Sequence, residues 1–265
     1  MIVDLHSHTS SSHDGFTTQA ELLEACLVRG IDEIAVTEHD AFCTLDGYLF
    51  EKNGVELIPG REFTTDGGAH VLGLFISNSI PASNSRHDIV HHIKAQNGIV
   101  IMPHPWKPNS GYLAVHEEDE LIWEFDFIEL VNGGWRAEKY SDNIVKIAQN
   151  YNLKMVASSD SHRGCQVGLC ATRIVGIQVF HVGDAKSHLH NVTQDNLELL
   201  IDKRGFIRKG RRNRWFQVTN LYQIILPLIP VLIRRYFKRI HYTFSGDSRP
   251  GTPHYDIFKV GKNPW

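Results

Sequence analysis

Histidines and carboxylates follow apolar segments at several widely separated places in the sequence. His6 and His8 stand two residues apart shortly after Met1-Ile2-Val3, so on a β-strand their side chains would point to the same face. The same arrangement recurs along the chain at His39, Glu62, His104, Asp160 and His162. Imidazole and carboxylate ligands without thiolates suit Zn²⁺, Mn²⁺ or Fe²⁺, and a set this large exceeds the needs of one ion. The pattern therefore predicts a centre of two or three divalent metal ions.

Each of these residues also has a simpler explanation. A histidine or aspartate at a strand end often caps or turns the chain, and two neighbouring histidines can both be exposed. Five strands that end in the same way favour the metal centre, because the carboxyl ends of the strands of an α/β barrel meet at one face. Several other histidines are expected to take no part, namely His13, His91, His92, His188 and His190.

The chain alternates apolar, β-rich runs with helical patterns. We expect strands at residues 1–5, 31–36, 55–63, 69–76, 99–102, 125–131, 154–158 and 171–176. We expect helices at residues 18–29, 43–52, 86–96, 137–150 and 196–203, the first of them opened by a capping box of Thr18 and Glu21 and ended by Gly30. This alternation is typical of an α/β fold with a mainly parallel sheet, either open or closed into a barrel.

The composition is that of an ordinary globular protein, with 42% hydrophobic and 22% charged residues over 265 positions. This length suits one large α/β domain or two small ones. Charge is unevenly distributed, since residues 201–240 contain eleven Lys or Arg and one acid whereas the first 200 residues are acidic. The four cysteines show no C-x-x-C spacing and the first residues show no signal-peptide pattern. We therefore expect a reducing, cytoplasmic location.

A basic segment at residues 203–239 has three open interpretations. Its apolar part, residues 221–233, is interrupted by Pro227 and Pro230 and is shorter than the roughly 20 residues of a membrane span. The segment packs on the fold as a helix, lies on an anionic membrane surface, or binds nucleic acid. We favour the packed helix, because prolines within an apolar run suit a bent segment.

Several short motifs occur in the same order as in a known family. They are Asp4-Leu5-His6-Ser7-His8, His13-Asp14-Gly15, Thr37-Glu38-His39-Asp40, Gly60-Arg61-Glu62, His70, Pro103-His104-Pro105 and Ser159-Asp160-Ser161-His162. With these motifs the first part of the chain resembles the polymerase and histidinol phosphatase (PHP) family of metal-dependent phosphoesterases. The resemblance implies a distorted (β/α)7 barrel over residues 1–205, followed by a basic and apolar C-terminal extension at residues 206–265.

The resemblance also implies a role for each motif residue. The first ion would be held by His6, His8, Glu62 and Asp160, the second by Glu62 as a bridge with His70 and His104, and the third by Asp14, His39 and His162. Glu62, Asp160 and His162 would be the catalytic residues of an in-line attack on phosphorus by a hydroxide that bridges the ions. Lys107 and Arg163 would hold phosphate oxygens, although solvated charges at strand ends are an equally simple explanation.

The expected function is hydrolysis of a small phosphate ester or nucleotide by a metal-dependent phosphoesterase. Two alternatives remain open. One is a nuclease in which the basic segment tracks a polynucleotide backbone. The other is a metal-binding module without activity that docks on a partner. The large ligand set argues against the module, because a structural metal site needs no open coordination position.

Overall fold

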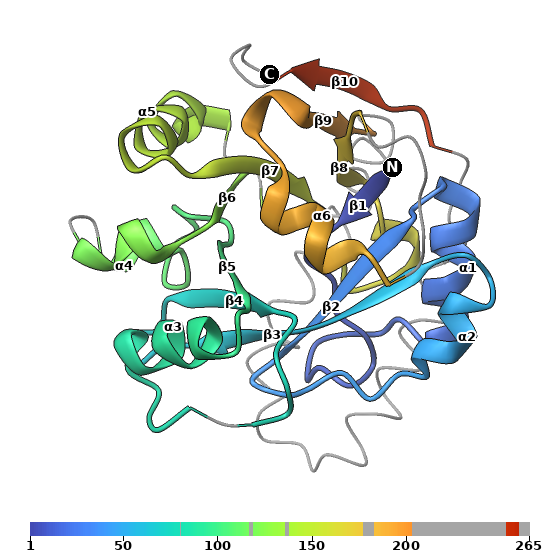
Figure 1. Cartoon of the computed structure of the whole chain (residues 1–265), viewed down its shortest axis with the longest axis horizontal. Coiled ribbons are helices and arrows are strands. Elements are labelled where there is room, and N and C mark those ends of the chain that lie inside the picture. The colour runs from blue at the N-terminus through green and yellow to red at the C-terminus, as the bar shows by residue number, and fades with distance from the viewer. Residues whose placement is uncertain (80, 117–118, 136–137, 177–182, 203–252, 260–265) are drawn as a thin grey trace, which may run out of the picture.

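One curled sheet dominates the computed structural model, which describes residues 1–79, 81–116, 119–135, 138–176, 183–202 and 253–259. Ten strands form this sheet in the order β10-β9-β8-β1-β2-β3-β4-β5-β6-β7. Figure 1 shows the sheet curling into an incomplete barrel with helices around it. The fold is therefore mixed α/β, as predicted, and the count of seven β/α units stays a prediction.

The strands follow the apolar runs of the sequence. They are β1 (Ile2–Asp4), β2 (Glu33–His39), β3 (Glu56–Thr64), β4 (His70–Leu74), β5 (Ile99–Met102), β6 (Phe127–Asn132), β7 (Lys154–Ser158), β8 (Cys170–Ile174), β9 (Leu197–Ile201) and β10 (Asp256–Lys259). The α-helices are α1 (Gln19–Arg29), α2 (Gly47–Glu51), α3 (Arg86–Ala95), α4 (Tyr112–Val115), α5 (Ser141–Tyr151) and α6 (Ala185–Asn191). Short 3-10 helices are η1 (Glu120–Glu124), η2 (Glu138–Tyr140), η3 (Gly164–Gln166) and η4 (Gln194–Asn196).

Parallel and antiparallel pairs are mixed within the sheet. The pairs β1/β2, β2/β3, β5/β6 and β6/β7 are parallel, whereas the other five neighbouring pairs are antiparallel. The prediction of a mainly parallel sheet is therefore wrong. One cause is the tight turn from Thr65 to Ala69, which connects β3 directly to β4. Two strands joined by such a short turn can pair only in the antiparallel direction.

The curl brings the end of β7 back beside the end of β1. The backbone N–H of His8 donates to Ser161 O at 2.8 Å, and Ser7 pairs with Ser161 in a parallel bridge. On the neighbouring strand, Thr172 Oγ1 accepts from Ala157 N and donates to Ala157 O, both at 2.9 Å. Chain segments that are distant in the sequence therefore meet at the carboxyl ends of β1 and β7.

Apolar side chains fill the inside of the curl. Val3 and Leu72 belong to this inner cluster, and Ala185 and Leu189 of α6 complete it. Helix α6 lies at the amino ends of the parallel strands, where Glu56 at the start of β3 accepts from the backbone N–H of Ala185 at 3.1 Å. Two further apolar clusters lie between the outer face of the sheet and the helices α3 and α5 on one side, and α1 and α2 on the other. The carboxyl ends of the strands are thereby left to polar residues.

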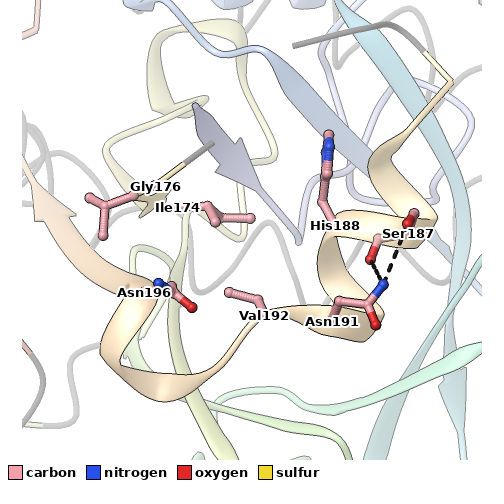
Figure 2. Close-up of a pocket in the computed structure, with 8 residues that line it drawn as sticks. Ile174, Gly176, Ser187, His188, Asn191, Val192 and Asn196 are labelled. Carbon is pink, nitrogen blue, oxygen red and sulfur yellow. Dashed lines mark hydrogen bonds between the residues drawn. The ribbon is translucent and has the colours of Figure 1, made fainter. Parts of the chain in front are cut away.

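A hollow of about 250 Å³ lies between α6 and the end of β8 (Figure 2). Because β8 runs antiparallel to β1, this hollow is at the amino ends of the parallel strands. None of the predicted site residues lines it. Its walls come from Ile174, Val175, Gly176, Ser187, His188, Asn191, Val192 and Asn196.

Two of the predicted helices differ from the structure. The helix predicted at residues 196–203 is wrong, because residues Leu197–Ile201 form β9, antiparallel to β8. Leu197 packs inside the curl and Leu200 packs outside it, and a short run buried on both faces cannot be distinguished from a helix by its periodicity. The helix predicted at residues 43–52 is shorter and begins at Gly47. The Asp46 side chain caps its first turn by accepting from Tyr48 N at 3.1 Å.

The last strand of the sheet comes from near the end of the chain. Asp256 of β10 lies opposite Ile201 of β9 in an antiparallel pair, and the Tyr255 hydroxyl donates to Gly168 O at 2.9 Å. The predicted domain boundary at residue 205 stays a prediction, and the basic segment at residues 203–239 lies outside the described residues. Within the described part of the chain, no helix has the length and apolar character needed to span a membrane.

Candidate metal centre

The nine predicted metal ligands lie together at one end of the curled sheet. His39 and Glu62 are register partners at the carboxyl ends of β2 and β3. His70 opens β4, and because β4 runs antiparallel to β3, its first residue lies beside the end of β3. The remaining six follow β1, β5 and β7 in the chain, namely His6, His8, Asp14, His104, Asp160 and His162.

Glu62 is the centre of this group. Its Oε1 atom lies 2.6 Å from His70 Nδ1 and 3.1 Å from His104 Nε2. Its Oε2 atom lies 3.2 Å from His8 Nε2 and 3.1 Å from His39 Nδ1, and 3.3 Å from Nε2 of His6. Each carboxylate oxygen thus faces a different set of imidazoles, which is the arrangement that a bridging ligand requires.

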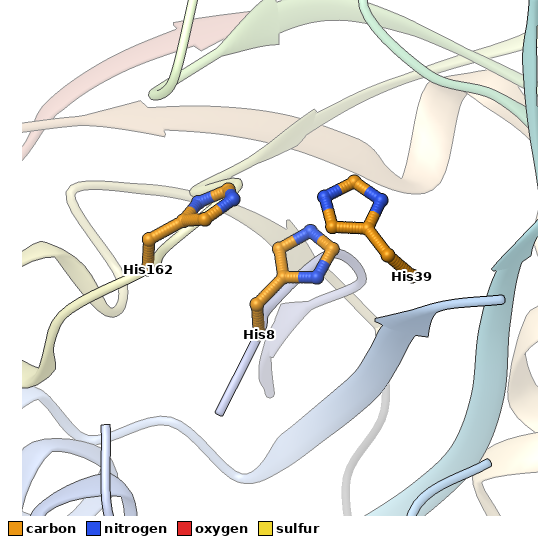
Figure 3. A group of neighbouring side chains, drawn as sticks. All are labelled: His8, His39 and His162. Carbon is orange, nitrogen blue, oxygen red and sulfur yellow. The ribbon is translucent and has the colours of Figure 1, made fainter. Parts of the chain in front are cut away.

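A second group lies around Asp14. Figure 3 shows the rings of His8, His39 and His162 turned toward one another, and one nitrogen from each ring forms a set whose members lie within 4.8 Å of one another. Asp14 Oδ2 lies 3.1 Å from His162 Nε2 and 3.6 Å from His39 Nε2. Asp14, His39 and His162, which the resemblance implies as ligands of a third ion, therefore lie together, with His8 beside them.

The contacts between ligand atoms fit a bound cation. His6 Nδ1 lies 3.0 Å from Glu129 Oε1, and because a carboxylate only accepts, this nitrogen carries a proton. In a neutral ring the lone pair is then on His6 Nε2, which lies 3.1 Å from His8 Nε2. Asp160 Oδ2 is buried and has no hydrogen-bond partner among the described residues. Such converging lone pairs are stabilised by a divalent ion, and the imidazole and carboxylate donors suit Zn²⁺, Mn²⁺ or Fe²⁺.

Charges within the centre shift the pKa values of its members. Burial opposes the charged form of His6, but the carboxylates of Asp160, Glu62 and Glu129 outweigh it and raise the pKa of His6 well above its ordinary value. Burial likewise opposes charge on Glu62, yet the imidazoles of His6 and His104 lower the pKa of Glu62 well below its ordinary value. The Glu62 carboxylate is thus ionised, and a proton on His6 supplies positive charge that a bound cation would otherwise supply.

Backbone conformations at two ligands are unusual. His104 has φ of 30° and Asp160 has φ of 46°, in the left-handed region that residues other than glycine rarely adopt. Gly134 approaches the Asp160 carboxylate so closely that a side chain at this position would overlap it. Such local strain persists only where the surrounding structure imposes it, and it is concentrated at functional sites.

Glu129 is a further candidate residue of the centre, and the motifs did not predict it. This buried side chain of β6 accepts from His104 N at 2.7 Å and from Asn132 Nδ2 at 2.7 Å, in addition to its contact with His6. A carboxylate behind a metal-binding histidine fixes the tautomer and orientation of the ring. The sequence did contain an indication of this role, because a glutamate interrupts the apolar run from Phe127 to Val131. A carboxyl group within a buried strand needs a polar partner.

We expect Glu129→Gln to weaken metal binding by about 10- to 100-fold while leaving the fold intact. Three donors meet the two oxygens of Glu129, and an amide replaces one oxygen by a donor. Competition against a chromophoric chelator would measure the affinity, with circular dichroism to confirm folding. Glu124→Gln, at an exposed position in η1, is the matched control. Equal metal affinity of the Glu129→Gln variant and this control would show that Glu129 does not position His6.

The two predicted phosphate-binding residues lie in different surroundings. Lys107 Nζ lies 3.8 Å from Asp160 Oδ2, beside the ligand group. The Arg163 guanidinium lies over the ring of Phe16, 5.3 Å from its centroid. Lys107 is therefore the better placed of the two for a substrate anion at the metal centre, and both roles stay predictions.

The histidines expected to take no part lie at the edge of the centre or away from it. The side chain of His13 is 74% exposed, and its ring lies 5.1 Å from that of His39. The others lie on α3 and α6, namely His91, His92, His188 and His190. His188 and His190 are therefore at the opposite end of the sheet from the metal centre.

Proteins of Methanocaldococcus jannaschii and Eggerthella lenta are similar to this chain in sequence. An uncharacterized protein of Methanocaldococcus jannaschii is 24% identical over 221 residues, which cover 81% of this chain and 89% of that protein. The phosphoribosyl 1,2-cyclic phosphate 1,2-diphosphodiesterase of Eggerthella lenta is 37% identical over 89 residues, which cover 31% of this chain and 34% of that protein.

A solved structure shares the fold. It is a two-domain protein from Bacteroides vulgatus described as containing a predicted PHP-like metal-dependent phosphoesterase, and it superposes with a TM-score of 0.57 at 21% sequence identity over 76% of this chain and 64% of that chain. The model of the PHP domain family matches residues 4–207. This match covers more than half of the chain and includes all nine residues of the centre, and the protein therefore belongs to the PHP domain family of metal-dependent phosphoesterases.

Proposed function

We propose that the protein hydrolyses the phosphoester bond of a small phosphorylated substrate at a centre of two or three divalent metal ions. The observation that carries this proposal is the position of Glu62, whose two carboxylate oxygens lie within 3.3 Å of five imidazole nitrogens. A structural metal site is closed by about four ligands. A shared carboxylate within a larger set of nine ligands instead suits a multinuclear catalytic centre.

The chain supplies the ligands for this chemistry, their buried surroundings and the ammonium group of Lys107 beside Asp160. When bound, divalent ions polarise the phosphoryl group and neutralise the charge that develops on its oxygens. His6, His8, Glu62 and Asp160 would hold the most buried ion, because all four are nearly inaccessible to solvent. The side chain of His162 is 25% exposed, so the group around Asp14 would face the substrate.

Lys107 would bind a non-bridging phosphate oxygen. Its side chain is about one-third exposed beside Asp160, so its ammonium group can reach a bound anion. A point charge at this place would hold the phosphate and would not take part in bond cleavage. The phosphodiesterase named above acts, by its name, on a cyclic phosphate, and this supports a phosphate ester as the substrate class.

A panel of phosphate esters tests the proposal. The full chain, loaded with Mn²⁺, Zn²⁺ or Fe²⁺, would be incubated with sugar phosphates, mononucleotides, cyclic phosphodiesters and short oligonucleotides, and released products would be quantified. We expect hydrolysis of at least one small ester and its loss after treatment with a chelator. A protein that binds metal but cleaves no ester would contradict the proposal.

Nuclease activity is a second candidate function, favoured by the basic segment at residues 203–239. Lys and Arg side chains that neutralise phosphates release counterions, so polynucleotide affinity falls steeply with salt. We expect the affinity of the full chain for an oligonucleotide to fall by orders of magnitude between low and physiological salt if this segment binds it. Affinity that does not depend on salt would exclude this use of the segment.

A further inference from the structure

Three aromatic side chains stack on one another beside the metal centre. The ring of Trp106 lies 5.6 Å from that of Tyr140 with an angle of 11° between their planes. The ring of Trp135 lies 5.7 Å from that of Tyr140 with an angle of 21°. All three side chains are half-buried and pack against the apolar cluster below them. This set, which we name the aromatic stack, therefore has both a supported side and an exposed side.

The aromatic stack lies at the rim of the metal centre. Trp106 follows the ligand His104 by two residues, and its neighbour Lys107 lies 3.8 Å from Asp160. Trp135 directly follows Gly134, the position where a side chain would overlap the Asp160 carboxylate. Both tryptophans thus directly neighbour, in the chain, a residue that lies close to the candidate ligand Asp160.

A hydrogen-bond path fixes the aromatic stack relative to those ligands. The backbone N–H of Trp135 donates to Asn132 Oδ1 at 2.7 Å, and Asn132 Nδ2 donates to Glu129 Oε2 at 2.7 Å. Glu129 in turn holds His6 Nδ1 at 3.0 Å. The Trp135 backbone, and with it one end of the aromatic stack, is therefore linked to the candidate ligand His6 through two side chains.

We propose that the aromatic stack binds a nucleobase, so that the substrate of the metal centre is a mononucleotide or the terminal nucleotide of an oligonucleotide. This inference rests on the proposed phosphoesterase function and names its substrate class. Bases stack on aromatic faces without regard to sequence. Lys107 directly follows Trp106 of the stack and lies 3.8 Å from Asp160, and its ammonium group supplies the positive charge that a nucleotide phosphate requires. A base-free ester would use the metal centre and Lys107 alone.

A pair of ligands that differ only in the base tests the inference. Adenosine 5′-monophosphate and ribose 5-phosphate would be titrated into the metal-loaded full chain, with binding followed by calorimetry and by intrinsic tryptophan fluorescence. We expect the nucleotide to bind about tenfold more tightly and to quench fluorescence, whereas the sugar phosphate leaves fluorescence unchanged. Equal affinities of the two ligands would overturn the inference.

Substitutions locate the binding site of the base. We expect Trp106→Leu to reduce nucleotide affinity about tenfold, with the affinity for ribose 5-phosphate unchanged, and Trp106→Phe to restore most of the loss. Trp123→Leu is the matched control, because Trp123 is 63% exposed and belongs to η1, which precedes β6 at the opposite end of the sheet. An equal loss of affinity for the two ligands in the Trp106→Leu variant would mean that Trp106 only supports the metal centre.

The two proposals can fail separately. Binding of adenosine 5′-monophosphate that depends on Trp106, without hydrolysis of any ester, would contradict the proposed function and support the base-binding site. Hydrolysis of ribose 5-phosphate and the nucleotide with the same kcat/KM would support the proposed function and overturn the base-binding site. Should Trp106→Leu fail to fold, the affinity ratio of the two ligands in the wild-type protein still decides the question.

Discussion

Replacement of Glu62 by glutamine should lower phosphoesterase activity by about a thousandfold, which corresponds to about 4 kcal/mol of transition-state stabilisation. The side chain keeps its size, but the shared negative charge is lost, and one oxygen becomes an amide group that repels a cation. Five imidazoles face this carboxylate, so metal affinity should fall as well. Steady-state kinetics at saturating metal and metal analysis would measure the two effects.

A second glutamate on the same strand provides the control. Glu56 opens β3 at the end away from the metal centre, where it accepts backbone N–H groups of Gly183 and Ala185. Glu56→Gln should leave kcat and metal content unchanged even if it lowers the melting temperature slightly. Near wild-type turnover of the Glu62→Gln variant would show that the carboxylate is not a bridge and that the centre is wrongly assigned.

Metal analysis of the loaded protein should find between about two and three equivalents of transition metal. The nine candidate ligands exceed the four to six that one ion coordinates. Removal of the metal with a chelator should lower the melting temperature by several degrees, because ions that bind only the folded state stabilise it. One equivalent or fewer after complete loading would contradict the multinuclear centre.

Metal binding should also release protons. The carboxylates raise the pKa of His6 above its ordinary value despite its burial. Asp14 and Asp160 likewise raise the pKa of His162, although burial opposes this shift. A cation can bind these nitrogens only after they are deprotonated, so affinity should rise with pH until the pH exceeds the raised pKa values. Calorimetry in buffers of different ionisation enthalpy would measure the number of protons released. A pH-independent affinity would exclude histidine ligands.

The sequence was sufficient to predict that the candidate ligands lie together, because their positions depend on strand ends. His6, His39 and His104 each follow an apolar run, and the carboxyl ends of such strands meet at one face whatever the details of the connections. For this reason the incorrect prediction of a mainly parallel sheet did not change which residues were expected to lie together. The position of His70 depends on a tight turn that the sequence also indicates, through Asp66-Gly67-Gly68.

Other features depend on contacts that a linear pattern does not contain. Whether Leu197–Ile201 forms a strand depends on its pairing with β8 and on burial of both faces, and periodicity cannot provide either. The role of Glu129 depends on the approach of His6 across the sheet. The aromatic stack joins residues from the segments after β5 and β6 and was not predicted, since single aromatic residues are usually core.

The pairing of β9 with β10 makes the chain between them removable. Ile201 and Asp256 are opposite each other, so the described chain before residue 203 and after residue 252 lies side by side in the sheet. A truncation at Gly205 would also remove β10, and its effect would not be specific to the basic segment. Replacing residues 203–252 by a short turn such as Asn-Gly keeps both strands. If the segment packs on the fold, this excision should cause aggregation and a lower melting temperature; a soluble, fully active product would exclude that role.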